Sequence, residues 1–147
     1  MPVNTDPIKL ARFGGPFHAV LRVTTALTFM SHGTAKFFAF PLLPPMPGAH
    51  GPMPAPALFS LFGAAGILEL VGGLLVLIGL FTRPVAFLLA GEMAIAFWMV
   101  HAGGGSVIPL VNHGESAYLF CFVFLWLSAA GAGPFSIDRR LEGGSAA

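Results

Sequence analysis

The stretch Phe17–Phe40, FHAVLRVTTALTFMSHGTAKFFAF, decides the fold of this chain, because it is an apolar run of helical length that contains basic side chains. At 100° per residue, Lys36 falls about 40° and His32 about 80° from Arg22 on a helical wheel. These three side chains therefore share one stripe of the predicted helix. Each of the later apolar runs supplies one carboxylate: Glu69, Glu92 and Glu115.

The composition is that of a membrane protein rather than a soluble one. The 147 residues suit a single domain, and 56% of them are hydrophobic while 9% are charged. Soluble domains carry about 25% charged residues. The mean hydropathy is +0.84. The chain has a formal net charge of +1 and no basic patch with interleaved aromatic residues, which argues against nucleic acid as a partner.

The single cysteine, Cys121, lies in a phenylalanine-rich run. One cysteine excludes an internal disulfide and a cysteine-based metal site, so we interpret it as a packing residue.

Four apolar segments are predicted to span the membrane. They are Phe17–Phe40, Ala57–Phe81, Pro84–His101 and His113–Ala132. The first is too long for a signal peptide, contains charges, and ends in a proline cluster instead of a small-residue cleavage site. The connections between the segments are a proline-rich loop, Pro41–Pro56, a tight turn, Thr82–Pro84, and a glycine-rich loop, Ala102–Asn112.

The positive charges predict the orientation. Lys and Arg residues outside the spans all fall on one side: Lys9, Arg12, Arg83, Arg139 and Arg140. Because cytoplasmic segments carry the excess of Lys and Arg, both termini are expected in the cytoplasm. The sequence thus predicts an all-α, four-helix transmembrane bundle over residues 16–133, with cytoplasmic tails over residues 1–15, interrupted by Gly14-Gly15, and over residues 134–147.

Three charges lie deep in the predicted membrane. Glu69 and Glu92 fall near the middle of their helices, and Arg22 lies closer to the cytoplasmic end. A central charge costs about 2.5–3.5 kcal/mol on insertion scales, so the three together would cost roughly 8–10 kcal/mol if they faced lipid unpaired. We expect Arg22 to pair with Glu92 or Glu69, and any unpaired acid to be protonated.

A second polar group lies towards the outer third of the predicted membrane. It consists of His32, Lys36, His101, His113 and Glu115, beneath a loop that carries His50. One interpretation is that these residues bind a ligand or relay protons; the other is that they fix the packing of the helices. A metal or haem site is disfavoured because no compact ligand spacing is present.

The order of short motifs resembles the DoxX family over about Leu21–Leu141. The motifs are Leu21-Arg22, Ser31-His32-Gly33, Lys36, Glu69-Leu70-Val71-Gly72-Gly73, Gly79-Leu80-Phe81-Thr82-Arg83-Pro84, Glu92-Met93, His101, Asn112-His113-Gly114-Glu115 and Gly131-Ala132-Gly133-Pro134-Phe135-Ser136-Ile137-Asp138. The resemblance implies a four-helix protein of the bacterial or archaeal plasma membrane. It also implies a link to membrane redox complexes, because relatives include a subunit associated with a thiosulfate:quinone oxidoreductase.

The functional hypothesis is a redox-linked subunit that binds a quinone or a similar apolar ligand. In it, His32, Lys36 or His101 hydrogen-bonds a quinone carbonyl, and Glu115 or Glu92 relays protons. The chain has no cysteine pair and no dinucleotide-binding motif, so no cofactor is expected within it and electrons must come from a partner protein. The alternatives are a non-catalytic accessory subunit of a larger membrane complex, and a small transporter or lipid-binding protein that self-associates.

Overall fold

The structure is a computed structural model that describes residues 7–42 and 55–144. Every regular element in these two ranges is a helix, which confirms the predicted all-α class. Most of the predicted proline-rich loop, with His50, lies outside the described residues.

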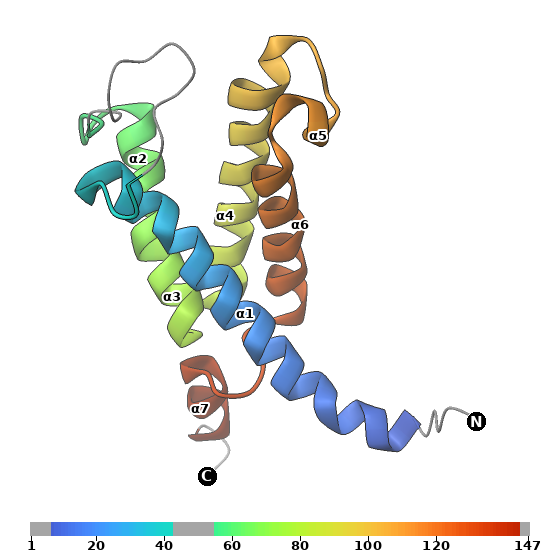
Figure 1. Ribbon diagram of the computed structural model, residues 1–147. Coiled ribbons are helices and arrows are strands. Elements are labelled where there is room, and N and C mark those ends of the chain that lie inside the picture. Colours follow the sequence, from blue (N-terminus) through green and yellow to red (C-terminus); the bar gives the residue numbers. More distant parts are fainter. Residues whose placement is uncertain (1–6, 43–54, 145–147) are drawn as a thin grey trace.

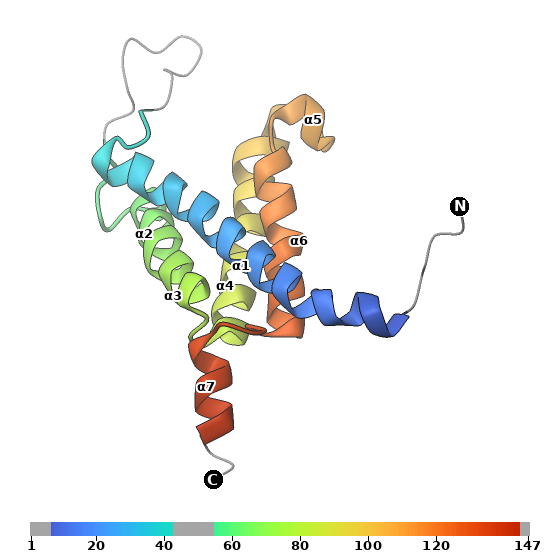
Figure 2. The ribbon, with the colours of Figure 1, turned by 60° about the horizontal axis from the view of Figure 1, so that its bottom comes forward.

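The first helix, α1 (Pro7–Phe38), begins earlier than predicted. The expected break at Gly14-Gly15 is wrong, because the helix continues through both glycines and through Pro16. The segment before them, Ile8-Lys9-Leu10-Ala11-Arg12, consists mostly of strong helix formers, which favours extension of the helix towards its N-terminus. Figure 2 shows this early part of α1 extending beyond the other helices.

The second helical stretch is continuous but changes its winding in the middle. It consists of α2 (Leu61–Ile67), the π-helical turn η1 (Leu68–Gly72) and α3 (Gly73–Ile78). The Ser60 side chain begins it by accepting a hydrogen bond of 3.0 Å from the Gly63 amide. Gly79, with φ of +67°, ends it in the left-handed conformation that favours glycine.

The third stretch turns back directly, as predicted, but the connection is formed by residues 79–81, and the predicted turn Thr82–Pro84 is the first turn of the next helix. It contains α4 (Thr82–Ala96), the π-helical turn η2 (Phe97–His101) and the 3₁₀ turn η3 (Ala102–Gly104). The predicted glycine-rich loop therefore begins as a helical turn. It also contains α5 (Pro109–Asn112), since Pro109 suits the first turn of a helix.

The chain ends with α6 (Glu115–Ala130) and α7 (Ile137–Gly144). α4 packs along α6, and α1 packs across α3 and η1. Between them, the Phe29 ring of α1 meets the Phe124 ring of α6 edge-on, with centroids 4.7 Å apart. Both side chains are fully buried, so this contact joins the two helix pairs.

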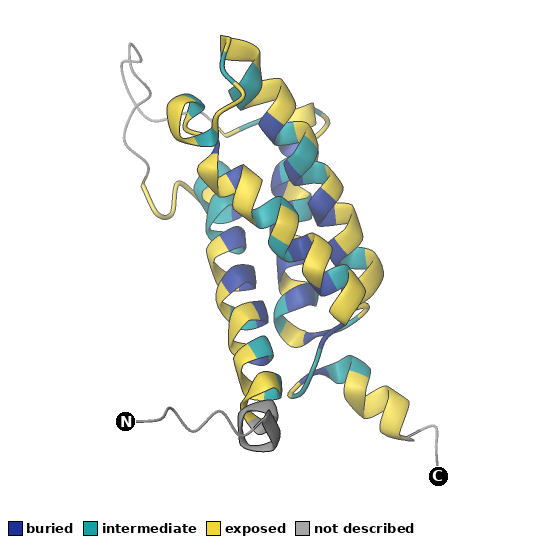
Figure 3. Ribbon diagram, turned by 90° about the vertical axis from the view of Figure 1, so that its right-hand side faces the viewer, coloured by how far each residue is buried: buried dark blue, intermediate teal, exposed yellow. Residues whose placement is uncertain are grey.

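The outward faces of these helices are exposed, as Figure 3 shows. Large apolar residues contribute to this exposed surface: Phe87 in α4, Trp98 in η2 and Trp126 in α6 are each more than half exposed. By length and composition, Leu61–Ile78 and Thr82–Gly104 are apolar and long enough to cross a membrane, and α6 is apolar but shorter. An apolar exterior of this extent is typical of a protein surrounded by lipid.

Candidate functional site

Arg22 binds a helix end rather than a carboxylate. It is fully buried, and its Nη1 donates hydrogen bonds of 2.8 Å to Val76 O and 2.5 Å to Leu77 O, while Nη2 donates one of 2.9 Å to Phe135 O. The predicted pairing of Arg22 with Glu69 or Glu92 is therefore wrong. The physical reason is that the last carbonyls of a helix have no amide partners within it and attract a cation.

Two more charged residues bind the unpaired backbone groups at helix ends. The sequence did not indicate this role for either residue. The Asp138 carboxylate accepts hydrogen bonds of 2.8 Å from the Phe81 amide and 2.9 Å from the Thr82 amide at the start of α4. Arg83 donates hydrogen bonds to the carbonyls of Ser128, Ala129 and Ala130 at the end of α6. The only signal in the sequence was the glycine- and proline-containing segment before Asp138, which is typical of a compact turn.

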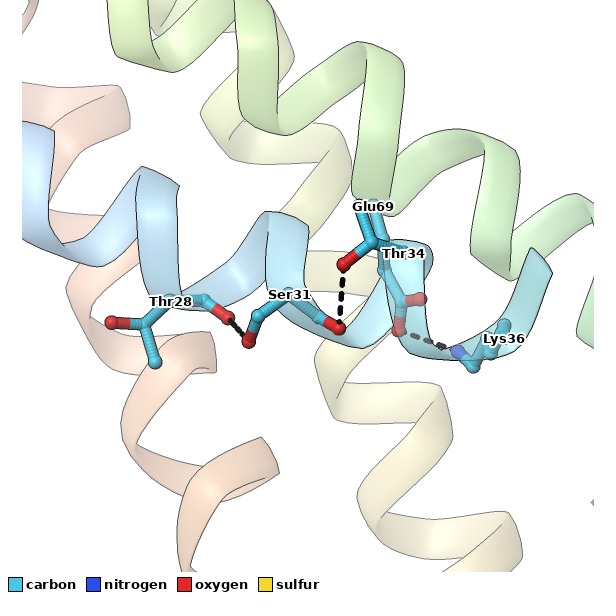
Figure 4. Close-up of polar contacts among 5 residues, drawn as sticks. All are labelled: Thr28, Ser31, Thr34, Lys36 and Glu69. Atoms are coloured by element: carbon cyan, nitrogen blue, oxygen red, sulfur yellow. Dashed lines mark hydrogen bonds and ion pairs between the residues drawn. The ribbon is translucent and has the colours of Figure 1, made fainter. Parts of the chain in front are cut away.

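Lys36 supplies the cation for Glu69. Its Nζ lies 2.5 Å from Glu69 Oε1, and Figure 4 shows the carboxylate reaching from η1 to the ammonium on α1. The Glu69 side chain is 5% exposed and the Lys36 side chain 23%. The pair therefore joins α1 to the second helical stretch in a largely water-free position, where an uncompensated charge is costly.

Glycines allow this close approach. A Cβ on Gly66 would lie 2.6 Å from the Phe37 ring and 3.4 Å from Lys36 Cδ, and one on Gly33 would lie 3.0 Å from Gly66 O. The bare backbone of α2 thus leaves room for the aliphatic stem of Lys36. Glu69 itself stands in the π-helical turn η1, and such turns are frequent at functional sites.

Glu92 completes the buried acidic group. It lies on α4, and its carboxylate interacts electrostatically with Glu69, which repels it, and with Lys36, which attracts it. Both Glu92 oxygens and Glu69 Oε2 are buried and have no hydrogen-bond partner within residues 7–42 and 55–144. Lys36, Glu69 and Glu92 are called the acidic centre below.

His32 lies one turn before Lys36 on α1. The Lys36 ammonium acts on it electrostatically, and its ring meets the Phe120 ring of α6 edge-on, with centroids 5.8 Å apart. Ser31 and Thr34 in the same turns donate their hydroxyls back to the α1 carbonyls of Thr28 and Ser31, as Figure 4 shows. His32 is thus the residue that links the acidic centre to α6.

The predicted outer group is only partly brought together. His32 and Lys36 interact, whereas His101 contacts the Asn112 carbonyl oxygen through Nδ1 at 3.2 Å. His113 and Glu115 are exposed, and the backbone amide of His113 donates a hydrogen bond to Pro109 O at the end of α5. No three His, Cys, Asp or Glu side chains in the described parts of the chain gather where they could hold a metal ion.

The remaining histidine on α1, His18, has a packing role. Its Nε2 lies 2.9 Å from the Gly131 carbonyl oxygen, just after α6.

The acidic centre has the properties of a proton-handling site. It combines a cation with two carboxylates in a buried position, three of whose oxygens lack partners among the described residues. In many membrane proteins, buried ionisable groups of this kind bind or relay protons and cations.

Comparisons with known proteins agree with the motif pattern. The DoxX family model matches residues 17–102. An uncharacterized protein of Haemophilus influenzae is 41% identical over 134 residues, which cover 90% of this chain and 96% of that protein. No solved structure matches.

Proposed function

Because the chain belongs to the DoxX family of membrane proteins, we propose that it is a four-helix transmembrane protein of the bacterial or archaeal plasma membrane, with both termini in the cytoplasm. The proposed spans are α1, the α2–α3 stretch, the α4–η2 stretch and α6. Two observations support this topology. The outer faces are apolar, and the start of α1, the α3–α4 turn and α7, which carry most of the basic residues, lie at one end of the molecule (Figure 1).

The proposed role is that of a redox-linked subunit that binds a quinone or a similar apolar ligand and works with a partner protein. The acidic centre carries this proposal. A quinone that accepts two electrons must also accept two protons to become a quinol, and a buried carboxyl group beside an ammonium is suited to deliver them. The electrons come from the partner.

The residues proposed for these roles differ in support. Glu92 and Glu69 are the candidates for proton transfer, since their free oxygens are buried. Lys36 and His32 are the candidates to hydrogen-bond a quinone carbonyl. The Lys36 ammonium has three donors and uses one of them on Glu69, and the His32 ring is half-buried beside Phe120. His101, His113 and Glu115 receive less support, as His101 contacts the adjacent loop and the other two are exposed.

The test begins with native mass spectrometry of the protein extracted from its own membrane, which identifies a bound quinone and a co-purifying redox protein. Quinone-dependent turnover of that assembly is then measured for Glu92→Gln and Glu69→Gln. We expect both to lower turnover at least tenfold while the assembly stays intact. The matched control is Glu142→Gln, which removes an exposed carboxylate in α7 and leaves turnover unchanged. Normal turnover in both test variants contradicts the proposal.

A non-catalytic accessory subunit is the second candidate, and a specific observation favours it. Arg22, Arg83 and Asp138 are all engaged in closing helix ends, so much of the chain's charge serves its own architecture. On this alternative the acidic centre also serves packing alone. Loss of the assembly on deletion of the protein, with normal turnover in the glutamate variants, is the result that it predicts.

A further inference from the structure

The acidic centre has too many acceptors for its donors. Glu69 accepts from the Lys36 ammonium through Oε1, but its Oε2 and both oxygens of Glu92 are buried without a partner in the part of the chain that the structure describes. Glu69 as a whole is only 3% exposed. A buried oxygen without a donor is costly, and η1, which carries Glu69, packs against α4, which carries Glu92, so these three oxygens favour the uptake of a donor by one of the two acids.

The charges point to the same conclusion. One ammonium stands against two carboxylates, and Glu92 is repelled by Glu69. In a low-dielectric interior, an uncompensated negative charge is far more costly than in water. A single positive charge would neutralise the group.

We propose that Glu69 and Glu92 hold one exchangeable proton between them, so that the acidic centre is a proton-binding site whose occupancy follows charge neutrality. A proton on Glu92 turns one unpartnered oxygen into a donor for the Glu69 carboxylate. This assignment goes beyond the proposed function, since it concerns the chain alone and requires neither a quinone nor a partner.

The groups that face Glu92 allow this assignment. Lys36 on α1 and Glu69 on η1 both act electrostatically on Glu92, and His32 lies one turn before Lys36 on α1. α6, which packs along α4, carries no Lys, Arg, Asp or Glu between Ser116 and Ala130. Arg22 is engaged with the carbonyls of Val76 and Leu77. Within the described residues, Lys36 is thus the cation that compensates Glu69 and Glu92.

Charge neutrality predicts how many protons the acidic centre binds in each variant, and this number can be measured. The number of bound protons should equal the number of carboxylates minus the number of ammonium groups. The full chain should therefore carry one protonated carboxylic acid, Lys36→Met should carry two, and Glu92→Gln should carry none. Glu69→Gln should also carry none, because Glu92 then ionises and compensates Lys36.

Infrared spectroscopy of the protein in liposomes at neutral pH measures this directly through the carbonyl stretch of a protonated carboxylic acid. We expect this band in the full chain, with a shift in D₂O that shows exchange. Its intensity should double in Lys36→Met and vanish in Glu92→Gln and Glu69→Gln. Glu142→Gln, an exposed acid in α7, should leave it unchanged. Far-UV circular dichroism of each variant verifies the helical fold.

Three results would overturn the proposal. The first is the absence of the band from the full chain. The second is a band that persists in a folded Glu92→Gln protein. The third is a band that appears only when sodium is replaced by choline, since this would identify a bound alkali cation in place of the proton. None of these readouts depends on quinone turnover, so the proton site and the proposed redox role succeed or fail separately.

Discussion

Arg22 Nη1 donates a hydrogen bond of 2.8 Å to Val76 O, and this bond joins the fully buried cation of α1 to the last turn of α3. A second donor of the same guanidinium reaches Phe135 O, in the segment that leads to α7. Three segments far apart in the sequence are therefore held by one side chain. The planar guanidinium presents several donors in a fixed geometry, which a lysine cannot reproduce.

Arg22→Gln is expected to destabilise the protein by about 2–5 kcal/mol, because it removes the guanidinium donors from the carbonyl oxygens of Val76, Leu77 and Phe135, of which Val76 O keeps the Gly79 amide as a donor. Arg22→Lys should lose a smaller part of this stability, since it keeps the charge but not the fork of donors. Equilibrium unfolding in detergent measures both effects. Arg140→Gln, an exposed arginine in α7, serves as the control. Equal stability of Arg22→Gln and Arg140→Gln would contradict the assigned role.

Asp138→Ala is expected to weaken the start of α4. The substitution removes both acceptors from the Phe81 and Thr82 amides, and the loss of a comparable N-terminal cap costs about 0.5–2 kcal/mol. Hydrogen exchange of these two amides should accelerate by about the corresponding 2- to 30-fold. Glu142→Ala, in the same helix, should not change their exchange. Unaltered protection in Asp138→Ala would show that the cap is unimportant.

The helices were predictable because their signals are local. Hydropathy located the apolar stretches, and the short connection before the third stretch was expected, although it lies at residues 79–81 and Thr82-Arg83-Pro84 begins α4. The start of α1 differs from the prediction because the helix formers before Gly14-Gly15 extend the helix through both glycines. Local propensity is a weak guide when a helix continues from a stable core.

The partners of the buried charges were not predictable in the same way. The sequence showed that Arg22, Glu69 and Glu92 must be buried, but the pairing depends on how the helices are staggered. α3 ends beside Arg22, so carbonyl oxygens meet it, and Glu69 lies opposite Lys36 instead. A helical wheel gives the face of a residue and not its neighbour on another helix.

Lys36 and Glu69 should show strong coupling in a double-mutant cycle. Lys36→Met removes the cation of Glu69, so Glu69 must take up a proton to stay neutral; this loss of the ion pair is expected to destabilise the protein by up to about 3–5 kcal/mol, the cost of a fully broken buried pair. In the double variant Lys36→Met/Glu69→Gln no ion remains unpaired, so most of that stability should return. Unfolding of the single and double variants in detergent gives the coupling energy. Additive effects would mean that the ion pair contributes nothing.

Two glycine substitutions should change stability in opposite directions. At Gly133, φ is +69° and a Cβ would lie 2.4 Å from His18 Cδ2, so Gly133→Ala combines backbone strain with a clash. We expect Gly133→Ala to lower the free energy of unfolding by at least about 1–2 kcal/mol.

At Gly91, inside α4, a Cβ would meet nothing within 4 Å, so Gly91→Ala should stabilise the helix by about 0.5–1 kcal/mol. Unfolding midpoints measured in the same detergent compare the two variants, and a stabilised Gly133→Ala protein would contradict the close packing of His18 against the segment after α6.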